Sequence, residues 1–184
     1  MLVSGRGSNL QSIIDAIRDG RLNATIAIVV SNRADAAALN RATDAGIETA
    51  CILRSGYPDR DSCDRAVVDL LRARGVELVC LAGYMQPVRQ PMLDAFPNRI
   101  LNIHPSLLPA FPGLHAQQQA LEHGVKIAGA TVHIVTSKID DGPILAQAAV
   151  PVLSTDTVET LSARILAEEH RIYPETIGRV LAEN

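Results

Sequence analysis

Short runs of consecutive apolar residues alternate along this chain with stretches whose apolar residues recur at helical spacing. Residues 26–30 and 78–82 contain no polar side chain. Such runs are typical of parallel strands that are covered by helices on both faces. Further strands are expected at residues 48–53 and 100–103.

Three expected helices separate these strands, and a glycine follows each of them: residues 10–18 before Gly20, 34–45 before Gly46, and 61–74 before Gly75. Glycine just beyond the last turn is typical of a helix that ends in a left-handed residue. The first hundred residues therefore predict the order βαβαβαβ, which is a doubly wound parallel sheet.

The pattern changes after Pro112. A short helix is expected at residues 116–122, followed by two strands at 128–135 and 144–152. The loop 136–143 between them permits an antiparallel pair and is long enough to carry functional residues. The sequence thus predicts an α/β fold, doubly wound and mostly parallel, with antiparallel strands in its C-terminal part.

A final helix is expected to begin near Thr157. Thr155 or Asp156 can cap it, because their side-chain oxygens accept hydrogen bonds from free helical N–H groups. Pro174 is expected to kink or restart this helix, because proline cannot donate the hydrogen bond that the helix interior requires.

Composition narrows the class of protein. With 184 residues, of which 47% are apolar, and no linker, the chain predicts a single domain over residues 1–184. The net charge is −3 and no basic run is interleaved with aromatic residues, so nucleic acid is not an expected partner. We find no signal-sequence pattern and no apolar stretch long enough to span a membrane. We therefore expect a cytoplasmic protein without a membrane partner.

The three cysteines do not suggest a disulfide framework or a metal site. Cys51, Cys63 and Cys80 are odd in number and lack C-x-x-C spacing. We expect Cys51 and Cys80 to be reduced thiols in the core, because both lie in apolar strands.

Residues 4–9, Ser-Gly-Arg-Gly-Ser-Asn, join the first strand to the first helix. Glycines allow a sharp turn there, and a helix N-terminus offers free N–H groups and a positive dipole end to an anion. Leu10 replaces the third glycine of a dinucleotide fingerprint, and no acidic residue ends the second strand. The loop therefore predicts a site for a single phosphate monoester, although two glycines can also serve the turn alone.

The strand at residues 100–103 leads into a second group of polar side chains. Asn102 and His104 share one face, because alternate residues of a strand do. Both can stabilise an oxyanion, and His104 does so more strongly when protonated. A nearby carboxylate favours the protonated imidazole, and Asp140 is our candidate. This set predicts acyl transfer through a tetrahedral intermediate.

A metal site is the alternative interpretation of the same residues. His104, His133, Asp140 and Asp141 could be drawn as ligands. No pair of them has a recurrent zinc spacing such as H-E-x-x-H, so we do not expect a metal.

Five segments, in this order, resemble the folate-dependent formyltransferases: residues 4–11 (Ser-Gly-Arg-Gly-Ser-Asn-Leu-Gln), 81–85 (Leu-Ala-Gly-Tyr-Met), 102–109 (Asn-Ile-His-Pro-Ser-Leu-Leu-Pro), 112–115 (Pro-Gly-Leu-His) and 140–143 (Asp-Asp-Gly-Pro). Residues 102–106 (Asn-Ile-His-Pro-Ser) are shared by formyltransferases that use 10-formyltetrahydrofolate, and the Gly-Ser-Asn loop indicates the phosphoribosylglycinamide formyltransferases among them. The resemblance covers essentially the whole chain. It implies a Rossmann-like fold, with phosphate binding in residues 1–100 and catalysis and folate binding in residues 100–184.

The resemblance also implies roles for matching residues. Gly7, Ser8 and Asn9 would bind the substrate 5′-phosphate, and Glu169 the ribose, although Glu168 and Glu169 can also be a solvated helix face. Catalysis would fall to Asn102, His104 and Asp140. The folate would contact Arg60, Met85, Gln86, Pro87, Val88, Asn102, Thr136, Ile139 and Asp140. His133 is expected to be supporting structure.

The implied reaction moves the formyl group of 10-formyltetrahydrofolate to the amine of phosphoribosylglycinamide, a step of purine biosynthesis. Partners would be small molecules, in a monomer or homodimer. Two positions depart from the family pattern: Gln86-Pro87 replaces an arginine and an aliphatic residue, and only three residues precede the phosphate loop, so the first strand is short or begins upstream.

Three other functions remain open. A formyltetrahydrofolate hydrolase shares residues 102–106 but normally adds an N-terminal domain and lacks the Gly-Ser-Asn loop. A formyltransferase for initiator tRNA normally has a further C-terminal domain. A binding module for phosphorylated metabolites would keep the loop and lose the chemistry, against which the intact Asn102, His104 and Asp140 argue.

Overall fold

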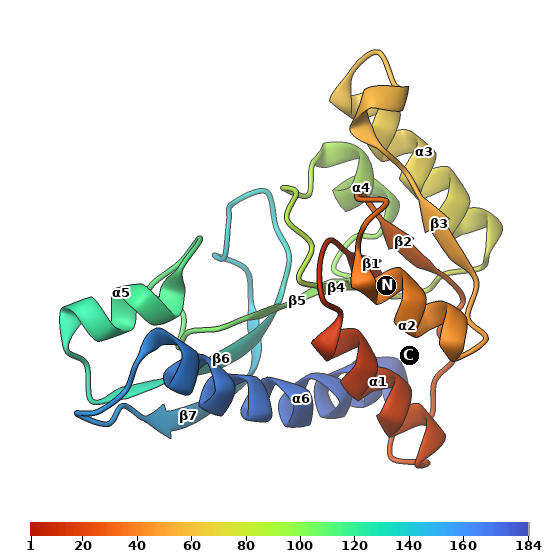
Figure 1. The fold of residues 1–184 in the computed structure, drawn as a ribbon. Coiled ribbons are helices and arrows are strands. Elements are labelled where there is room, and N and C mark those ends of the chain that lie inside the picture. The colour runs from red at the N-terminus through yellow and green to blue at the C-terminus, as the bar shows by residue number, and fades with distance from the viewer. Residues whose placement is uncertain (184) are drawn as a thin grey trace.

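The computed structural model describes residues 1–183. Its centre is a seven-stranded sheet in the order β3-β2-β1-β4-β5-β6-β7 (Figure 1). The strands are β1 (Leu2–Val3), β2 (Val29–Ser31), β3 (Thr49–Cys51), β4 (Val79–Ala82), β5 (Ile100–His104), β6 (Ile127–Ile134) and β7 (Ile144–Pro151). Strands β1 to β5 are parallel and β6 and β7 are antiparallel, which confirms the predicted fold class.

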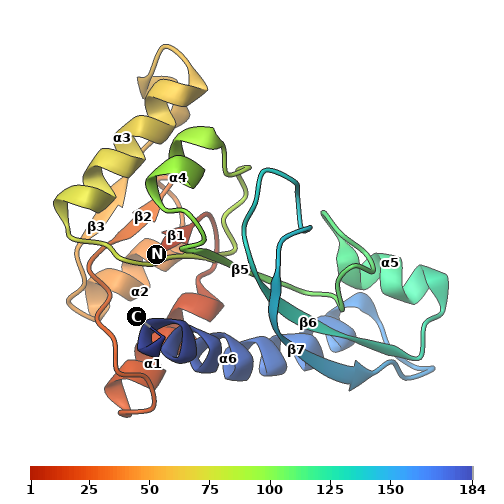
Figure 2. The ribbon, with the colours of Figure 1, turned by 180° about the vertical axis from the view of Figure 1, so that it is seen from behind.

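Helices cover both faces of the sheet (Figures 1 and 2). They are α1 (Ser8–Arg18), α2 (Ala37–Asp44), α3 (Arg60–Ala73), α4 (Gln90–Ala95), α5 (Ala116–His123) and α6 (Val158–Ala182), with a 3₁₀ turn at Arg54–Gly56. Buried residues of α1, α2, α5 and α6 form one core cluster, and those of α3 and α4 form the other. Adjacent strand residues alternate between the clusters: Leu2 belongs to one and Val3 to the other.

The helix ends agree with the sequence. Gly20, Gly46 and Gly75 have φ angles of 72°, 70° and 65°, so all three adopt the left-handed conformation that was expected. The sequence pattern did not predict α4, which is only six residues long and has a proline in its first turn. A helix of that length is too short to show a 3.6-residue period.

The last helix begins where it was expected, but its predicted caps need correction. Thr157 is the N-cap, and its side chain and that of Thr160 accept hydrogen bonds from each other's backbone N–H groups. Asp156 instead accepts from the N–H of Leu153 at 2.8 Å and binds Arg164. The predicted caps Thr155 and Asp156 are therefore wrong.

Helix α6 also runs through Pro174, so the expected restart there is wrong. The residues around Pro174 are buried against the sheet: Tyr173 is fully buried and Ile177 lies in the same core cluster. This packing holds the helix together on both sides of the missing hydrogen bond.

The cysteines divide between core and surface. Cys80 is buried, as expected, and burial raises the pKa of its thiol to about 11. Cys51 is exposed, so its expected burial is wrong. The reason is its place at the end of β3, the edge strand of the sheet. Cys63, in α3, is buried.

None of the described helices combines the length and the apolar composition that a membrane crossing requires.

Candidate active site

The loop between β1 and α1 has the geometry of an anion-binding turn. Gly7 is the N-cap of α1 and has φ 76°. A side chain at Gly7 would also place its Cβ 2.7 Å from the Cβ of Ala38, so both the backbone angle and the packing of α2 require glycine. The first turn of α1 has no acidic residue, which leaves the positive end of the helix dipole open to an anion.

Asn9, in the first turn of α1, meets Glu169 of α6. Nδ2 of Asn9 donates a 2.7 Å hydrogen bond to Oε2 of Glu169. Glu169 is 6% exposed, so the alternative of a solvated helix face is wrong for this residue. Burial raises the pKa of Glu169, and the hydrogen bond from Asn9 opposes this in part. Glu168 points elsewhere and binds Arg171.

His104 lies at the carboxyl end of β5 with both ring nitrogens engaged. Nε2 is 2.9 Å from the carbonyl oxygen of Phe111 and therefore carries a proton, because a carbonyl only accepts. Nδ1 is 3.4 Å from Oδ2 of Asp140. A second proton on Nδ1 would make an imidazolium that faces a carboxylate. The ring is almost wholly buried, which strengthens this interaction.

Asp140 is held in place by three groups. Its Oδ2 accepts a 2.8 Å hydrogen bond from the N–H of Gly113, and Oδ1 is 3.6 Å from Nε2 of His133. Burial raises the pKa of Asp140, but the neighbouring His133, the hydrogen bond from Gly113 and the charge of His104 together outweigh burial, so the pKa lies below its usual value. The structure thus places an ionised carboxylate beside His104.

Asn102 faces the same region from β5 and pairs with His133 of β6. The two residues are opposite each other in the sheet, with 3.1 Å between Nδ2 and Nε2. Nδ1 of His133 is 3.1 Å from the carbonyl oxygen of Ile134 and must donate to it. When the ring carries this proton alone, Nε2 accepts from Nδ2 of Asn102. His133 contacts both Asn102 and Asp140, which is the arrangement of a supporting residue.

Sequence reasoning missed the groups that hold the loop after β5. Thr131 Oγ1 donates to the carbonyl oxygen of Ser106 at 2.7 Å and accepts from the N–H of Leu108 at 3.0 Å. Gln147 Nε2 donates to the carbonyl oxygen of Leu108 at 2.9 Å. These contacts position the segment that carries Phe111. The available signal was Thr131, one of the two polar residues, with His133, in the mostly apolar strand β6.

The residues expected to contact folate lie in the loops after β4 and β6, at the start of α3 and in β5. Arg60, at the start of α3, donates a 3.1 Å hydrogen bond from Nη1 to Oε1 of Gln86. Met85 and Ile139 are exposed by 65% and 72%, so each offers apolar surface to a ligand. Val88 packs against the core cluster of α3 and α4. Pro87 adjoins Val88, and Thr136 accepts a hydrogen bond from the N–H of Lys138 in the loop after β6.

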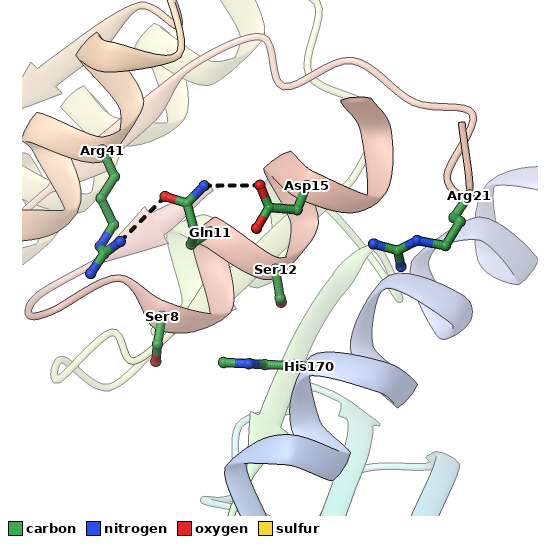
Figure 3. Close-up of a pocket in the computed structure, with 7 residues that line it drawn as sticks. All are labelled: Ser8, Gln11, Ser12, Asp15, Arg21, Arg41 and His170. Atoms are coloured by element: carbon green, nitrogen blue, oxygen red, sulfur yellow. Dashed lines mark hydrogen bonds between the residues drawn. The ribbon is translucent and has the colours of Figure 1, made fainter. Parts of the chain in front are cut away.

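A cavity of about 380 Å³ opens next to the phosphate loop (Figure 3). Its walls come from α1, α2 and α6 and from the turn after α1. The lining residues are Ser8, Gln11, Ser12, Asp15, Arg21, Arg41 and His170. Ser8 and His170 point toward the same space in Figure 3, so the cavity adjoins the turn that we expect to bind phosphate.

No group of histidine, cysteine or acidic side chains within residues 1–183 has the arrangement of a metal site. His104, His133 and Asp140 are instead joined to one another and to backbone groups by hydrogen bonds and close polar contacts.

Comparison with known proteins defines the class. Residues 1–177 match the family model described as formyl transferase, so the chain belongs to the formyl transferase family. Within that family it is similar to the phosphoribosylglycinamide formyltransferase of Escherichia coli (strain K12), with 43% identity over 97% of this chain and 84% of the relative.

Two further similarities extend this placement. The crystal structure of glycinamide ribonucleotide transformylase 1 from Symbiobacterium toebii has 63% sequence identity and a TM-score of 0.95, covering 96% of this chain and 84% of that one. The trifunctional purine biosynthetic protein adenosine-3 of Homo sapiens is 45% identical over 98% of this chain. The chain spans only 18% of that longer protein.

Proposed function

We propose that this protein transfers the formyl group of 10-formyltetrahydrofolate to the amine of 5′-phosphoribosylglycinamide. The products are formylglycinamide ribonucleotide and tetrahydrofolate, in de novo purine biosynthesis. The observation that carries this proposal is the contact between His104 and Asp140 at the carboxyl end of β5. The anion-binding turn follows β1, a parallel strand of the same sheet, so both sites open at one edge.

In the proposed mechanism the neutral amine of the ribonucleotide attacks the formyl carbon, whose oxygen becomes an oxyanion. Asn102 has two amide N–H groups; one donates to His133, and the other donates to the oxyanion. His104 is protonated and contributes its positive charge. No activated serine or cysteine takes part.

Asp140 then moves the proton. Its carboxylate holds His104 in the charged form, and it receives the proton that the attacking amine loses, directly or through a water molecule. The same proton passes to the departing folate nitrogen as the carbon–nitrogen bond breaks. Atoms and charge balance without a metal, and we assign none to this reaction.

The remaining residues bind the substrates. Gly7, Ser8 and Asn9 hold the 5′-phosphate, supported by the open N-terminus of α1. Glu169, fixed by Asn9, accepts hydrogen bonds from ribose hydroxyls. The folate is bound by Arg60, Met85, Gln86, Pro87, Val88, Asn102, Thr136, Ile139 and Asp140.

We further propose that one domain does this work in the cytoplasm, as a monomer or homodimer. Residues 1–100 supply the phosphate site, and residues 100–184 supply the catalytic groups and the folate-binding loop after β6. The names of the relatives favour the transferase over the hydrolase and the non-catalytic module.

The test is conversion of 10-formyltetrahydrofolate to tetrahydrofolate by the purified protein, with and without glycinamide ribonucleotide. The proposal expects conversion that requires the ribonucleotide. Equal conversion in both samples would identify a hydrolase instead. If neither sample reacts but calorimetry detects ribonucleotide binding, the protein is a binding module and the proposal is wrong.

A further inference from the structure

The cavity beside Ser8 contains an arginine that the proposed roles do not use. Arg41 lies on α2, and two neutral oxygens hold its guanidinium. Nε donates to the carbonyl oxygen of Arg6 at 2.8 Å, and Nη1 donates to Oε1 of Gln11 at 3.3 Å. These contacts fix the head group against the phosphate loop, and Figure 3 shows the contact with Gln11.

The charge of Arg41 is not neutralised by a neighbour. Within residues 1–183 no carboxylate forms an ion pair with it. Guanidinium has five N–H donors, and the contacts with Arg6 and Gln11 leave several of them free. A fixed cation with free donors is well suited to a phosphate, which it can bind through two parallel hydrogen bonds.

The other basic residues of the cavity are less suitable. Nη2 of Arg21 is 3.3 Å from Oδ2 of Asp19, which balances its charge. Burial lowers the pKa of His170, and the charge of Asp15 only partly offsets this, so the imidazole is neutral at physiological pH. Arg41 is therefore the lining residue whose positive charge is available to an anion.

His170 supplies a second indication of a ligand. Its Nε2 is buried and has no hydrogen-bond partner in the part of the chain that the structure describes. Buried polar atoms usually have partners, so a ligand oxygen in the cavity would satisfy it. The acidic residue of the cavity, Asp15, is already engaged: its Oδ1 accepts from Gln11 at 3.2 Å and pairs with Arg18 at 3.2 Å.

We propose that Arg41 is a phosphate-binding residue of the ribonucleotide site and supplies the positive charge that the loop of Gly7, Ser8 and Asn9 lacks. The proposal rests on the proposed function, because it identifies the ligand as a sugar phosphate. Arg41 also links the loop backbone to α2 and α1, so the cation and the N–H groups of the loop are held in one rigid arrangement.

The experiment measures binding of ribose 5-phosphate by calorimetry, without folate and without formyl transfer. Replacement of Arg41 by glutamine (R41Q) should weaken binding about tenfold, the usual effect of losing a hydrogen bond to a charged group. R41K keeps the positive charge but not the planar guanidinium, so its affinity should fall less than that of R41Q. Arg21→Gln is the matched control, because Arg21 lines the same cavity but already pairs with Asp19. The affinity of this variant for ribose 5-phosphate should stay within about twofold of the wild type.

Two readouts separate charge from loop structure. Added salt should weaken ligand binding by the wild type more steeply than binding by R41Q, because the variant has one positive charge fewer for salt to screen. At saturating glycinamide ribonucleotide, R41Q should keep its kcat while KM rises. A flat salt response in both proteins, or equal losses in kcat and binding, would assign Arg41 a structural role only and overturn the proposal.

The binding arm also keeps this inference distinct from the proposed reaction. If the wild type binds ribose 5-phosphate through Arg41 but transfers no formyl group, Arg41 stands and the proposed reaction fails. If R41Q binds as tightly as the wild type, or Arg21→Gln loses as much, Arg41 is not the phosphate ligand, whatever the formyl transfer assay gives.

Discussion

Nδ1 of His104 lies 3.4 Å from Oδ2 of Asp140, although one residue ends β5 and the other lies in the loop after β6. The same carboxylate oxygen accepts the N–H of Gly113, so its position is fixed from a third segment. A buried carboxylate held in this way does not need to move when the imidazole becomes charged. Electrostatic stabilisation of this kind is strongest where the groups are already in position.

Asp140→Asn should therefore impair turnover far more than binding. The variant keeps the size of the side chain and an oxygen for Gly113, but it loses the negative charge beside His104. We expect kcat to fall by roughly 100-fold or more, and KM for either substrate to change far less. Steady-state kinetics on both substrates measures this.

The matched control is Asp141→Asn. Asp141 is the next residue of the same loop, but it is exposed and pairs only with Lys138 at 3.3 Å. Its kcat should equal that of the wild type. Similar losses in the two variants would mean that loop charge in general, rather than contact with His104, supports the reaction.

Glu169→Gln should weaken binding of the ribonucleotide and stabilise the folded protein. Burial raises the pKa of Glu169 in the folded state. The free energy of unfolding therefore falls as pH rises through that pKa, because the buried carboxylate becomes charged. Glutamine cannot ionise, so the variant does not lose this stability. The variant should melt above the wild type at pH 8, with the difference shrinking toward about pH 4, near the unfolded pKa. We also expect an affinity about tenfold lower, since the charged acceptor for ribose is lost.

Glu168→Gln is the control for both readouts. Glu168 is the preceding residue and forms a surface ion pair with Arg171, so neither melting temperature nor affinity should change appreciably. A Glu169→Gln variant that melts below the wild type at pH 8 would show that the carboxylate stabilises the fold, against this argument.

The sequence predicted the secondary structure around the site better than the contacts within it. The reason is that secondary structure follows from local sequence patterns, whereas these contacts join segments that are distant in the sequence. Apolar runs and the terminating glycines are local, so the strands around Asn102 and His104 were predicted, although α4 was not. That β5 and the loop after β6 meet at Asp140 was inferred from residue chemistry alone. The contacts of Asp140 with Gly113 and of His104 with Phe111 involve backbone groups, which carry no sequence signal.

Errors arose where position in the sheet decides the outcome. Cys51 belongs to an apolar run, as Cys80 does, but β3 is an edge strand and β4 is central, so only Cys80 is buried. The role that we propose for Arg41 was not predicted for a similar reason. Arg41 lies on the exposed side of an amphipathic helix, and the proposal depends on its contact with the backbone of Arg6, which the sequence does not indicate.

Gly7→Ala should damage the phosphate site specifically. Gly7 and Gly20 both have positive φ angles, 76° and 72°, so alanine at either position is strained by about 1–2 kcal/mol. Only at Gly7 does the new Cβ also collide, 2.8 Å from Cα of Ala38, while Gly20 has nothing within 4 Å. Both variants should melt at lower temperature.

Only Gly7→Ala should raise KM for the ribonucleotide, by roughly tenfold or more, because the loop must move away from α2 and misplaces its N–H groups. Steady-state kinetics of Gly7→Ala and Gly20→Ala measures the difference in KM. Melting curves of both variants show how far backbone strain alone destabilises each protein. An unchanged KM in Gly7→Ala would show that the loop does not bind the phosphate.

The ion pair of Asp156 with Arg164 should make stability depend on pH. Arg164 binds both carboxylate oxygens, at 2.7 Å and 2.8 Å, and the side chain of Asp156 is 2% exposed. The hydrogen bonds from Arg164, with that from Leu153, lower the pKa of Asp156 in the folded state. A lowered pKa contributes stability above the unfolded pKa of about 3.9, and this is lost as pH falls through the folded value.

Asp156→Asn should accordingly melt below the wild type at pH 7, and the gap should narrow at pH 3, where the wild type has begun to lose this contribution. Melting curves at the two pH values measure it. Asp35→Asn is the control, because the ion pair of Asp35 with Arg33 is exposed and its loss should leave the melting temperature unchanged at both. An equal gap for Asp156→Asn at both pH values would contradict the explanation, since it would mean that the hydrogen bonds of Asp156 stabilise the start of α6 independently of its charge.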